Sequence, residues 1–338
     1  MIRIKDLARS LGLSITTVSR ALDGYPDVAE ETRRRVVAAA QALGYVPSAA
    51  ARQLRRQRAD AVGFVLPAST PRFSDPFHSM FVAGLCDEAA VLRMDVVVAS
   101  AAPGSPEEQW LYQRWVEAQR VDGVVLNRVR VDDWRIRFLQ ERSVPFAALG
   151  GALDAEYPCV VVKERQAMQQ MVEHLLLRGY RRIGFLGGPS DLLLQQERFG
   201  GYCDGLRSAG MKIEPAWVVA GDLTEDGGYA AAQHLLDKIP YPMALIGCND
   251  WMALGALRAV VERGLFVGRD VAVGGYDGLR EGEFSNPQLT TLEQPTYEIA
   301  RRLMRRLHDW VYEERQPEPV EIVEPVLRVR ASTLPQMS

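Results

Sequence analysis

The chain has 338 residues and 47% hydrophobic content, which is enough apolar material for more than one core. It shows no basic segment followed by an apolar run and no apolar stretch long enough to cross a bilayer, so we expect neither a signal peptide nor a transmembrane helix. The cysteines form no CxxC pair, which argues against zinc and a disulfide framework. We expect four buried free thiols in a reducing cytoplasm, at Cys86, Cys159, Cys203 and Cys248.

The net charge of −3 is unevenly distributed along the chain. Residues 1–60 contain 11 Lys and Arg against six acidic residues, whereas the remainder contains 29 basic against 37 acidic residues. A basic amino-terminal part on an acidic body indicates that only this part meets a polyanion.

Two short helices separated by a glycine are predicted first. Apolar residues recur at helical spacing over 4–11 and again over 15–22. Gly12 can adopt the left-handed conformation that ends a helix, and Ser14 suits the N-cap of the next one. A third helix should begin near Glu30, because acidic residues favour the positive N-terminus of a helix. Its buried stripe is expected to consist of Val36, Val37, Ala40 and Leu43.

This order of helices is typical of a helix-turn-helix module whose second helix enters the DNA major groove. Ile15 and Thr16 are expected to face base edges there, and Arg20 can bind a guanine or a phosphate. An ordinary small helical domain with a solvated basic face is the alternative.

The segment 47–58, PSAAARQLRRQR, carries one large apolar residue, Leu54, among four arginines. Pro47 can begin a helix, but an isolated helix of this length is marginal in water. Leu54 could wedge between base pairs in the minor groove while the arginines hold phosphates. A flexible charged linker without insertion is the alternative, and composition alone does not decide between the two.

From Ala61 onward, apolar runs alternate with helical patterns, which predicts two successive α/β lobes. Strands are expected at 61–67, 95–100, 122–127 and 144–150, then at 182–188, 217–222, 243–248 and 271–276. A helix near 295–313 and a terminal strand over 326–330 should complete the sheets. Because ligands of such sheets lie beyond the carboxyl ends of the strands, we expect a site in the cleft between the lobes.

Polar residues at these strand ends are the candidates for that site. They are Asn127, Asn249, Asp250 and Asp277, together with Arg198 near the start of a helix. Carboxylate, amide and guanidinium groups suit bidentate hydrogen bonds to a polyol or sugar. Phe73 and Phe77 could stack on a ring, although Phe77 could equally belong to the core and Asp250 could simply cap a helix.

Enzymatic motifs are missing from the chain. There is no GxGxxG after a strand, no P-loop, no HExxH and no GxSxG, and histidines number only four. We therefore expect no catalytic residues, no metal site and no cofactor. The basic amino-terminal part and the expected lack of a signal peptide also argue against a transport-type binding protein.

Nearly end to end, the chain resembles the lactose-repressor/galactose-repressor (LacI/GalR) family of bacterial transcription regulators. The matching stretches are IKDLARSLGLSITTVSRAL, VAEETRRRVVAAAQALGYVPSAAARQL, DPFH, VDGVVL, HLLLRGYRRIGFLGGP, ERFGGY, CNDWMALGALRAV and GYDGL followed by LTTLEQP. The resemblance implies an N-terminal all-α helix-turn-helix head, a hinge helix, and an α/β core of two Rossmann-like lobes similar to type I periplasmic binding proteins. It also implies a cytoplasmic homodimer, without a membrane partner, on near-palindromic double-stranded operator DNA.

The resemblance divides the chain into three parts. Residues 1–46 form the DNA-binding head, 47–60 the hinge, and 61–338 the effector-binding and dimerisation core. Lobe one is expected to comprise about 61–160 and about 290–325, and lobe two about 161–289 with the C-terminal strand.

Site residues follow from the same resemblance. Ile15, Thr16 and Arg20 match the family's base readers, and Leu54 matches a hinge leucine that wedges into the operator centre. The full set of expected DNA contacts is Lys5, Ser14, Ile15, Thr16, Thr17, Arg20, Thr32, Ala51, Leu54 and Arg55. The expected effector contacts are Phe73, Asp75, Phe77, Asn127, Arg198, Leu223, Asn249, Asp277 and Gln294.

Three departures from the family pattern bear on the effector. Lys163-Glu164 replace a frequent Asp-Asn pair, so no ligand contact is expected there. Residues 75–78 read DPFH rather than Asn-Pro-Phe-Phe, and Leu223 stands where some members have a sugar-stacking aromatic. The chain looks most similar to regulators of α-glucoside or other oligosaccharide use, so a sugar effector is expected. A purine base or a protein corepressor is the alternative.

Overall fold

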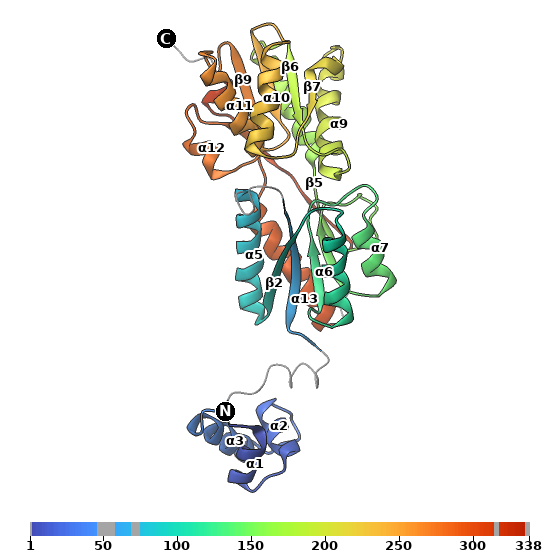
Figure 1. Cartoon of the computed structure of the whole chain (residues 1–338), viewed down its shortest axis with the longest axis vertical. Helices are drawn as coiled ribbons and strands as arrows, with labels where there is room; N and C mark the ends of the chain where they lie inside the picture. The colour runs from blue at the N-terminus through green and yellow to red at the C-terminus, as the bar shows by residue number, and fades with distance from the viewer. Residues whose placement is uncertain (1, 46–57, 69–74, 314–317, 335–338) are drawn as a thin grey trace. The chain divides into compact units, whose positions relative to one another are not determined.

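The computed structural model describes residues 2–45, 58–68, 75–313 and 318–334 (Figure 1). The chain divides into an amino-terminal unit that ends at Ala59 and a core unit that begins at Asp60. Most of the predicted hinge, residues 47–57 of 47–60, lies outside the described residues. Within the described part of the chain, no helix is long and apolar enough to span a membrane.

Three helices form the head, α1 (Ile4–Leu11), α2 (Ile15–Leu22) and α3 (Glu30–Ala42). The predicted glycine turn is confirmed, because Gly12 has a φ of +65°, which side chains with a Cβ rarely adopt. Ser14 caps α2 as expected, accepting a hydrogen bond from the Thr17 N–H at 3.0 Å.

A small apolar core joins these helices. It consists of Leu7, Ala8, Val18, Ala21, Val28, Val36 and Ala40. The predicted stripe of α3 is therefore right for Val36 and Ala40 but wrong for Val37 and Leu43, which are 39% and 40% exposed. Residues 36 and 40 lie one turn apart on the same face, and α3 buries only this narrow face against α1 and α2.

The first lobe is a six-stranded parallel sheet in the order β11-β5-β4-β3-β1-β2. Its strands are β1 (Ala61–Pro67), β2 (Asp95–Ala101), β3 (Gly123–Leu126), β4 (Phe146–Leu149), β5 (Cys159–Val162) and β11 (Val320–Val323). One face packs against α5 (Pro76–Leu92) and α13 (Thr296–Tyr312). The other face packs against α6 (Pro106–Glu117) and α7 (Trp134–Glu141). The inner strands read as continuous apolar runs because both of their faces are covered.

The second lobe repeats this architecture in the order β12-β10-β9-β8-β6-β7, with only β12 antiparallel. Its strands are β6 (Ile183–Gly187), β7 (Val218–Ala220), β8 (Met243–Gly247), β9 (Val271–Asp277), β10 (Thr290–Glu293) and β12 (Val326–Arg328). Its helices are α8 (Glu164–Leu177), α9 (Leu193–Ser208), α10 (Glu225–Leu236), α11 (Asp250–Glu262) and α12 (Arg280–Phe284). The pair α8 and α9 packs together, as does the pair α10 and α11.

The eight strands predicted in two series are confirmed to within about two residues at each end, as are the late helix and the terminal strand. Three strands were missed: β5, β10 and β11. Each of them has only four residues, and the polar side chains of Thr290, Thr291 and Glu321 interrupt two of the apolar patterns. Short strands of this kind are held by their neighbours rather than by their own pattern.

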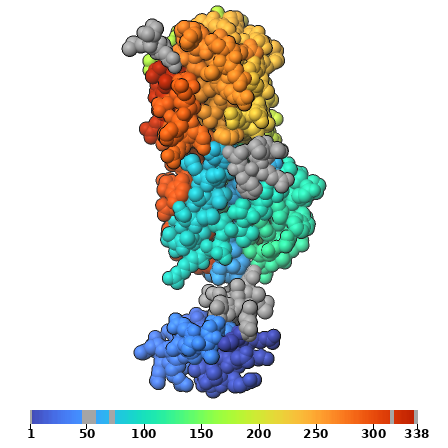
Figure 2. Space-filling view, turned by 60° about the vertical axis from the view of Figure 1, so that its left-hand side comes forward, coloured from blue at the N-terminus to red at the C-terminus, as the bar shows by residue number. Residues whose placement is uncertain are grey.

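The chain passes between the lobes three times, after β5, after β10 and after β11. The passage from the second lobe back to the first was expected near residue 290. Thr290–Glu293 still pair with Gly274–Asp277, so the second lobe extends to Glu293. Late, orange-to-red residues consequently appear on both lobes in Figure 2, and in the first lobe they lie beside the cyan surface of α5.

Three of the four free cysteines are buried, at 159, 203 and 248. Cys86 on α5 is exposed, so the prediction of four buried thiols is wrong at this position. Its neighbour Leu85 takes the inward position on the helix, which leaves residue 86 facing outward. Burial raises the pKa of Cys159 and Cys248 to about 11, which keeps both thiols protonated and unreactive at neutral pH.

Helices α8 and α9 approach closely at Gly201. A Cβ at this position would lie 2.1 Å from the backbone carbonyl oxygen of Arg165 and 2.9 Å from the Met168 Cβ. The preceding Gly200 instead faces the tip of the Arg165 side chain, 3.0 Å from its Nη1, which can move aside. The two adjacent glycines therefore differ in what a methyl group would meet.

We expect Gly201→Ala to lower the free energy of unfolding by about 1–3 kcal/mol, because backbone atoms must shift to admit the methyl group. Gly200→Ala, the matched control in the same helix, should be neutral or stabilising by up to about 1 kcal/mol, since alanine is the better helix former. Urea unfolding of the full-length variants measures both. Equal midpoints for the two variants would contradict the close approach of α8 and α9.

Asp250, the first residue of α11, joins three parts of the second lobe. Its carboxylate accepts hydrogen bonds from the Thr291 hydroxyl at 2.6 Å and from the Leu279 N–H at 2.7 Å. The neighbouring Asn249 is the N-cap, accepting a bond from the Met252 N–H at 3.0 Å. Asp250 is therefore a buried link and not a helix cap. Burial raises its pKa to about 8, and the charge of Asp277 acts in the same direction.

A folded-state pKa above the ordinary value of 3.8 means that folding favours protonated Asp250. Its contribution to stability is complete below pH 4 and is lost as pH rises toward 8, at up to about 1.4 kcal/mol per pH unit. Asp250→Asn removes this loss, so the variant should gain stability relative to the wild type as pH rises. Urea unfolding from pH 4 to 8 measures the difference.

Asp226→Asn on the exposed side of α10 removes the same charge and is the control, and the gain of Asp250→Asn with rising pH should exceed any change in this variant. If the free energies of unfolding of Asp250→Asn and the wild type differ by the same amount at every pH in this range, the raised pKa is contradicted.

Candidate functional site

The outward face of α2 carries the residues expected to read DNA. Ile15 is 51% exposed although it is a large apolar residue, and Thr16 and Arg20 are exposed beside it. Thr17 is half-buried, with its hydroxyl 2.8 Å from the Ser14 Oγ. Other expected contacts are distributed over the head: Lys5 and Ser14 are exposed, and Thr32 is half-buried. Ala51, Leu54 and Arg55 lie outside the described residues.

Arg20 has an ionic and an aromatic partner within the head. Its Nη2 lies 2.5 Å from an Asp27 carboxylate oxygen, and its guanidinium lies 5.0 Å from the centre of the Tyr25 ring. Both charged side chains are about half exposed, so water and salt screen the pair and its net contribution is small. Arg20 can therefore exchange Asp27 for a base or phosphate at little cost.

A cavity of about 670 Å³, here called the cleft, lies between the two lobes of the core. Seven of the expected effector contacts line it: Asp75, Phe77, Arg198, Leu223, Asn249, Asp277 and Gln294. Phe77 is 9% exposed and stacks on Phe81 of the core, at 6.0 Å between ring centres. Its place in the core is therefore confirmed, and its contact with a ligand stays a prediction.

Of the other two expected contacts, only Asn127 is among the described residues. Asn127 is 1% exposed and does not line the cleft, with its Nδ2 3.3 Å from the His78 Nδ1. The next residue, Arg128, takes the lining position instead. Phe73 lies outside the described residues.

The guanidinium of Arg198, on α9, is the centre of the second lobe's wall. Nη1 donates to the Cys248 carbonyl oxygen at 2.7 Å, and Nη2 donates to Glu164 Oε1 at 2.9 Å. The side chain also lies 3.6 Å from the centre of the Tyr276 ring. It is 3% exposed, so these contacts from α8 and the ends of β8 and β9 hold it in one place.

Asp277 is the second anchor of this wall. It accepts a hydrogen bond from the Gln294 Nε2 at 2.8 Å and lies 3.4 Å from Arg198 Nη2. Burial raises the pKa of this carboxyl group, although Arg198 acts in the opposite direction. An acceptor that binds two donors but retains lone pairs is suited to hold ligand hydroxyl groups.

The first lobe presents its own pair, Arg128 and Asp75. Asp75 caps α5 by accepting the Phe77 N–H at 3.0 Å, and its other oxygen receives Arg128 Nη2 at 2.8 Å. Burial raises the pKa of Asp75, whereas Arg128 lowers it. Both groups line the cleft opposite the Arg198 cluster.

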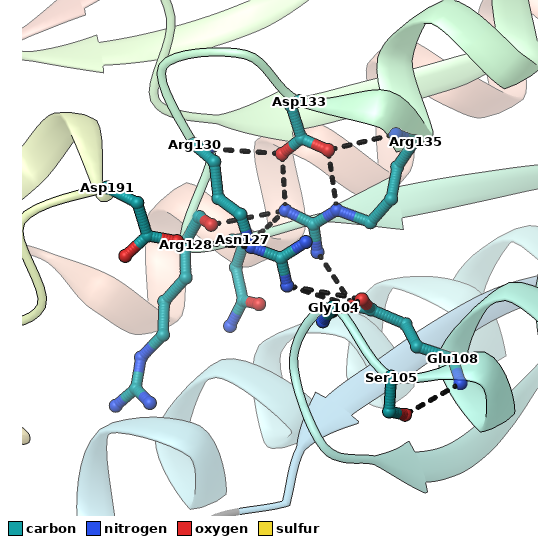
Figure 3. Close-up of polar contacts among 9 residues, drawn as sticks. All are labelled: Gly104, Ser105, Glu108, Asn127, Arg128, Arg130, Asp133, Arg135 and Asp191. Carbon is teal, nitrogen blue, oxygen red and sulfur yellow. Dashed lines mark hydrogen bonds and ion pairs between the residues drawn. The ribbon is translucent and has the colours of Figure 1, made fainter.

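A buried ionic network behind Arg128 holds it in position (Figure 3). Arg135 Nη2 donates to Asp133 at 2.6 Å and to the carbonyl oxygens of Asn127 and Arg128 at 3.2 and 3.1 Å. Burial opposes ionisation of Asp133, but the hydrogen bond from Arg135 holds its pKa below the usual value. The loop after β3 therefore rests on a charged pair that persists at neutral pH.

Two backbone hydrogen bonds join the lobes beside the cleft, and we call them the clasp. The Val131 N–H donates to the Asp191 carbonyl oxygen at 2.9 Å, and the Leu193 N–H donates to the Val129 carbonyl oxygen at 3.0 Å. Arg130 adds a 3.8 Å ion pair to Asp191 while Glu108 holds its other end at 3.2 Å (Figure 3). The clasp holds this arrangement of the lobes, and opening the cleft at this edge must break it.

Backbone strain also concentrates at the cleft. Arg128, Leu223 and Asp277 have positive φ angles of 47°, 67° and 116° and all line the cavity. Residues with a Cβ hold such angles only where the surroundings impose them, and such residues are common at ligand sites.

Two residues of the cleft wall, Arg128 and Glu164, were not among the expected effector contacts. Arg128 directly follows Asn127, the polar candidate at the end of β3. Its position at a strand end could therefore have identified it as a cleft residue. Glu164 differs from the family pattern, yet it lines the cleft and binds Arg198. No spacing in the sequence links position 164 to position 198.

Known protein families match both the head and the core of the chain. Residues 3–48 match the family described as bacterial regulatory proteins, lacI family, and residues 172–333 match a periplasmic binding protein-like domain. The chain is 33% identical over 340 residues to the HTH-type transcriptional regulator AglR of Rhizobium meliloti (strain 1021), covering 99% of this chain and 95% of the relative.

Solved structures show the same likeness. The transcriptional regulator CelR in complex with cellobiose is 32% identical, with a TM-score of 0.75 over 98% of this chain and 100% of that one. The lac repressor dimer bound to operator and the anti-inducer ONPF is 27% identical, with a TM-score of 0.85 over 98% and 99%. Sequence and structure thus match over nearly the whole of each chain, and the protein is a transcriptional regulator that belongs to the LacI family of bacterial regulatory proteins.

Proposed function

We propose that the protein represses carbohydrate-utilisation genes, binding a near-palindromic operator as a homodimer under the control of a sugar held in the cleft. One observation carries this proposal: the same chain combines an exposed reading helix with a cleft lined by fixed carboxylate, guanidinium and amide groups. Such groups suit the hydroxyl groups of a sugar. A cellobiose complex of a relative that is 32% identical supports the same ligand class.

Control of DNA binding by the sugar follows from linkage. A sugar that contacts both lobes favours one arrangement of them, and the clasp and the three chain passages limit which arrangements exist. If operator and sugar prefer different arrangements, each must weaken the binding of the other by the same factor.

Homodimer formation has support in the exposed apolar side chains of the first lobe. The edge strand β2 exposes Val98 by 40%, and the adjoining helix α5 exposes Val91 by 65%. An unprotected apolar edge of this kind is a common subunit contact. The operator-bound relative is itself a dimer.

We further infer that the protein acts in the cytoplasm, where the chromosome is, and that it has no catalytic activity. Relatives that match it end to end are transcriptional regulators. No observation favours a purine base or a protein corepressor over a sugar.

Arg20→Ala is expected to weaken operator binding by about 10–100-fold and to reduce discrimination against unrelated DNA, because a base contact of 1–3 kcal/mol is lost. Arg34→Ala on the exposed side of α3 is the control. It should weaken binding to both DNAs alike, by a smaller factor. Fluorescence anisotropy with an operator selected from random duplexes measures both, at several salt concentrations. An equal loss on both DNAs for Arg20→Ala would refute base reading by this residue.

A sugar that binds the cleft should raise the thermal midpoint of the full-length protein. We expect this from at least one of cellobiose, maltose, sucrose and trehalose, and not from purine bases. Asp277→Asn should abolish the shift because it removes a charged acceptor from the wall. Glu173→Gln, on the exposed side of α8, should preserve it. A midpoint raised by purines alone would overturn the proposed sugar control.

A further inference from the structure

Two buried arginines face the cleft, one from each lobe. Arg128 follows β3 in the first lobe, and Arg198 lies on α9 in the second. Their side chains are only 14% and 4% exposed. Unpaired guanidinium groups in such a place would form a strong site for phosphate or carboxylate, because their forked donors match those anions.

Each arginine instead carries a carboxylate partner from its own lobe. Asp75 at the start of α5 lies 2.8 Å from Arg128, and Glu164 at the start of α8 lies 2.9 Å from Arg198. Both carboxylates also line the cleft, and their side chains are 11% and 14% exposed. A third carboxyl group, that of Asp277, lies 3.4 Å from Arg198.

This balance sets the cost of binding an anion. A phosphorylated or carboxylated ligand would lose its hydration while facing these three acidic groups, and the charge of each guanidinium is already paired with a carboxylate. An uncharged polyol avoids that cost, and its hydroxyl groups can donate to the remaining lone pairs of the same acids. Over the whole lining, basic side chains do not outnumber acidic ones: Arg128, Lys163, Arg165 and Arg198 stand against Asp75, Glu164, Glu197, Asp204 and Asp277. The cleft is therefore polar but has no excess of positive charge.

We infer that Glu164 determines effector specificity: by neutralising Arg198 it makes the cleft accept uncharged sugars and exclude sugar phosphates and sugar acids. The inference rests on the proposed sugar function and states in addition that the sugar is uncharged. Position 164 belongs to the pair that differs from the family pattern, so a residue with no expected ligand contact acquires a defined role.

Matched ligand pairs test the inference on the full-length wild type. The probes are cellobiose, maltose, sucrose and trehalose, each beside its 6-phosphate, at constant ionic strength in calorimetric titrations. The uncharged member of the binding pair should bind at least tenfold more tightly than its phosphate. Equal or tighter binding of the phosphate overturns the inference while leaving a sugar effector in place.

Variants of α8 assign the effect to the residue. Glu164→Gln retains an acceptor for Arg198 but removes the charge. It should lower the ratio of the two dissociation constants, that of the sugar phosphate over that of the uncharged sugar, by tenfold or more. Glu173→Gln removes the same charge from the exposed side of α8 and should leave the preference unchanged. An unchanged preference in Glu164→Gln refutes the assigned role.

Inorganic phosphate provides a readout that needs no sugar. Compared with chloride at equal ionic strength, phosphate should raise the thermal midpoint of Glu164→Gln more than that of the wild type or Glu173→Gln. Any phosphate binding by the head is common to all three proteins and cancels in this comparison. If no sugar binds but phosphate separates the variants as stated, the proposed sugar function fails and the charge balance stands. If phosphate stabilises the wild type as much as Glu164→Gln, the charge balance fails.

Discussion

The cleft depends on one buried guanidinium, that of Arg198. It ties the ends of β8 and β9 to the start of α8 through the Cys248 carbonyl oxygen, Asp277 and Glu164. A buried charge is tolerated only when charged or strongly polar partners replace its lost water, and here these three partners bind its two Nη atoms, while Nε has no hydrogen-bond partner. The wall of the second lobe is consequently formed before any ligand arrives, so a ligand does not have to order it.

The wall of the first lobe is also held in place without a ligand, but by a different set of contacts. Arg135 binds the carbonyl oxygens of residues 127 and 128 and so sets the backbone from which Arg128 enters the cleft (Figure 3). With both walls preformed, the freedom that remains lies in the three passages between the lobes and in the clasp. Ligand binding is thereby converted into a choice between arrangements of two rigid bodies, which is the kind of change that can be passed to a second site.

Arginine serves opposite purposes in the two units of the protein. In the head, Arg20 pairs with Asp27 in water, where screening keeps the pair weak and exchangeable for DNA. In the cleft, Arg128 and Arg198 pair in a buried setting, where separation would leave an uncompensated charge. On this inference the head can meet a polyanion while the cleft is closed to anions, because the exposed pair exchanges its partner easily and the buried pairs do not.

Sequence alone determined the helix-turn-helix, because Gly12 and Ser14 act through local geometry, and most strands, because their apolar runs mark burial on both faces. It also identified seven of the cleft residues by strand ends and family resemblance. Only the tertiary structure revealed β5, β10 and β11, the exposure of Val37 and Cys86, and the replacement of Asn127 by Arg128 on the wall. The pairing of Glu164 with Arg198 belongs to this second group, since contacts between residues distant in sequence arise from chain crossings that no local pattern encodes.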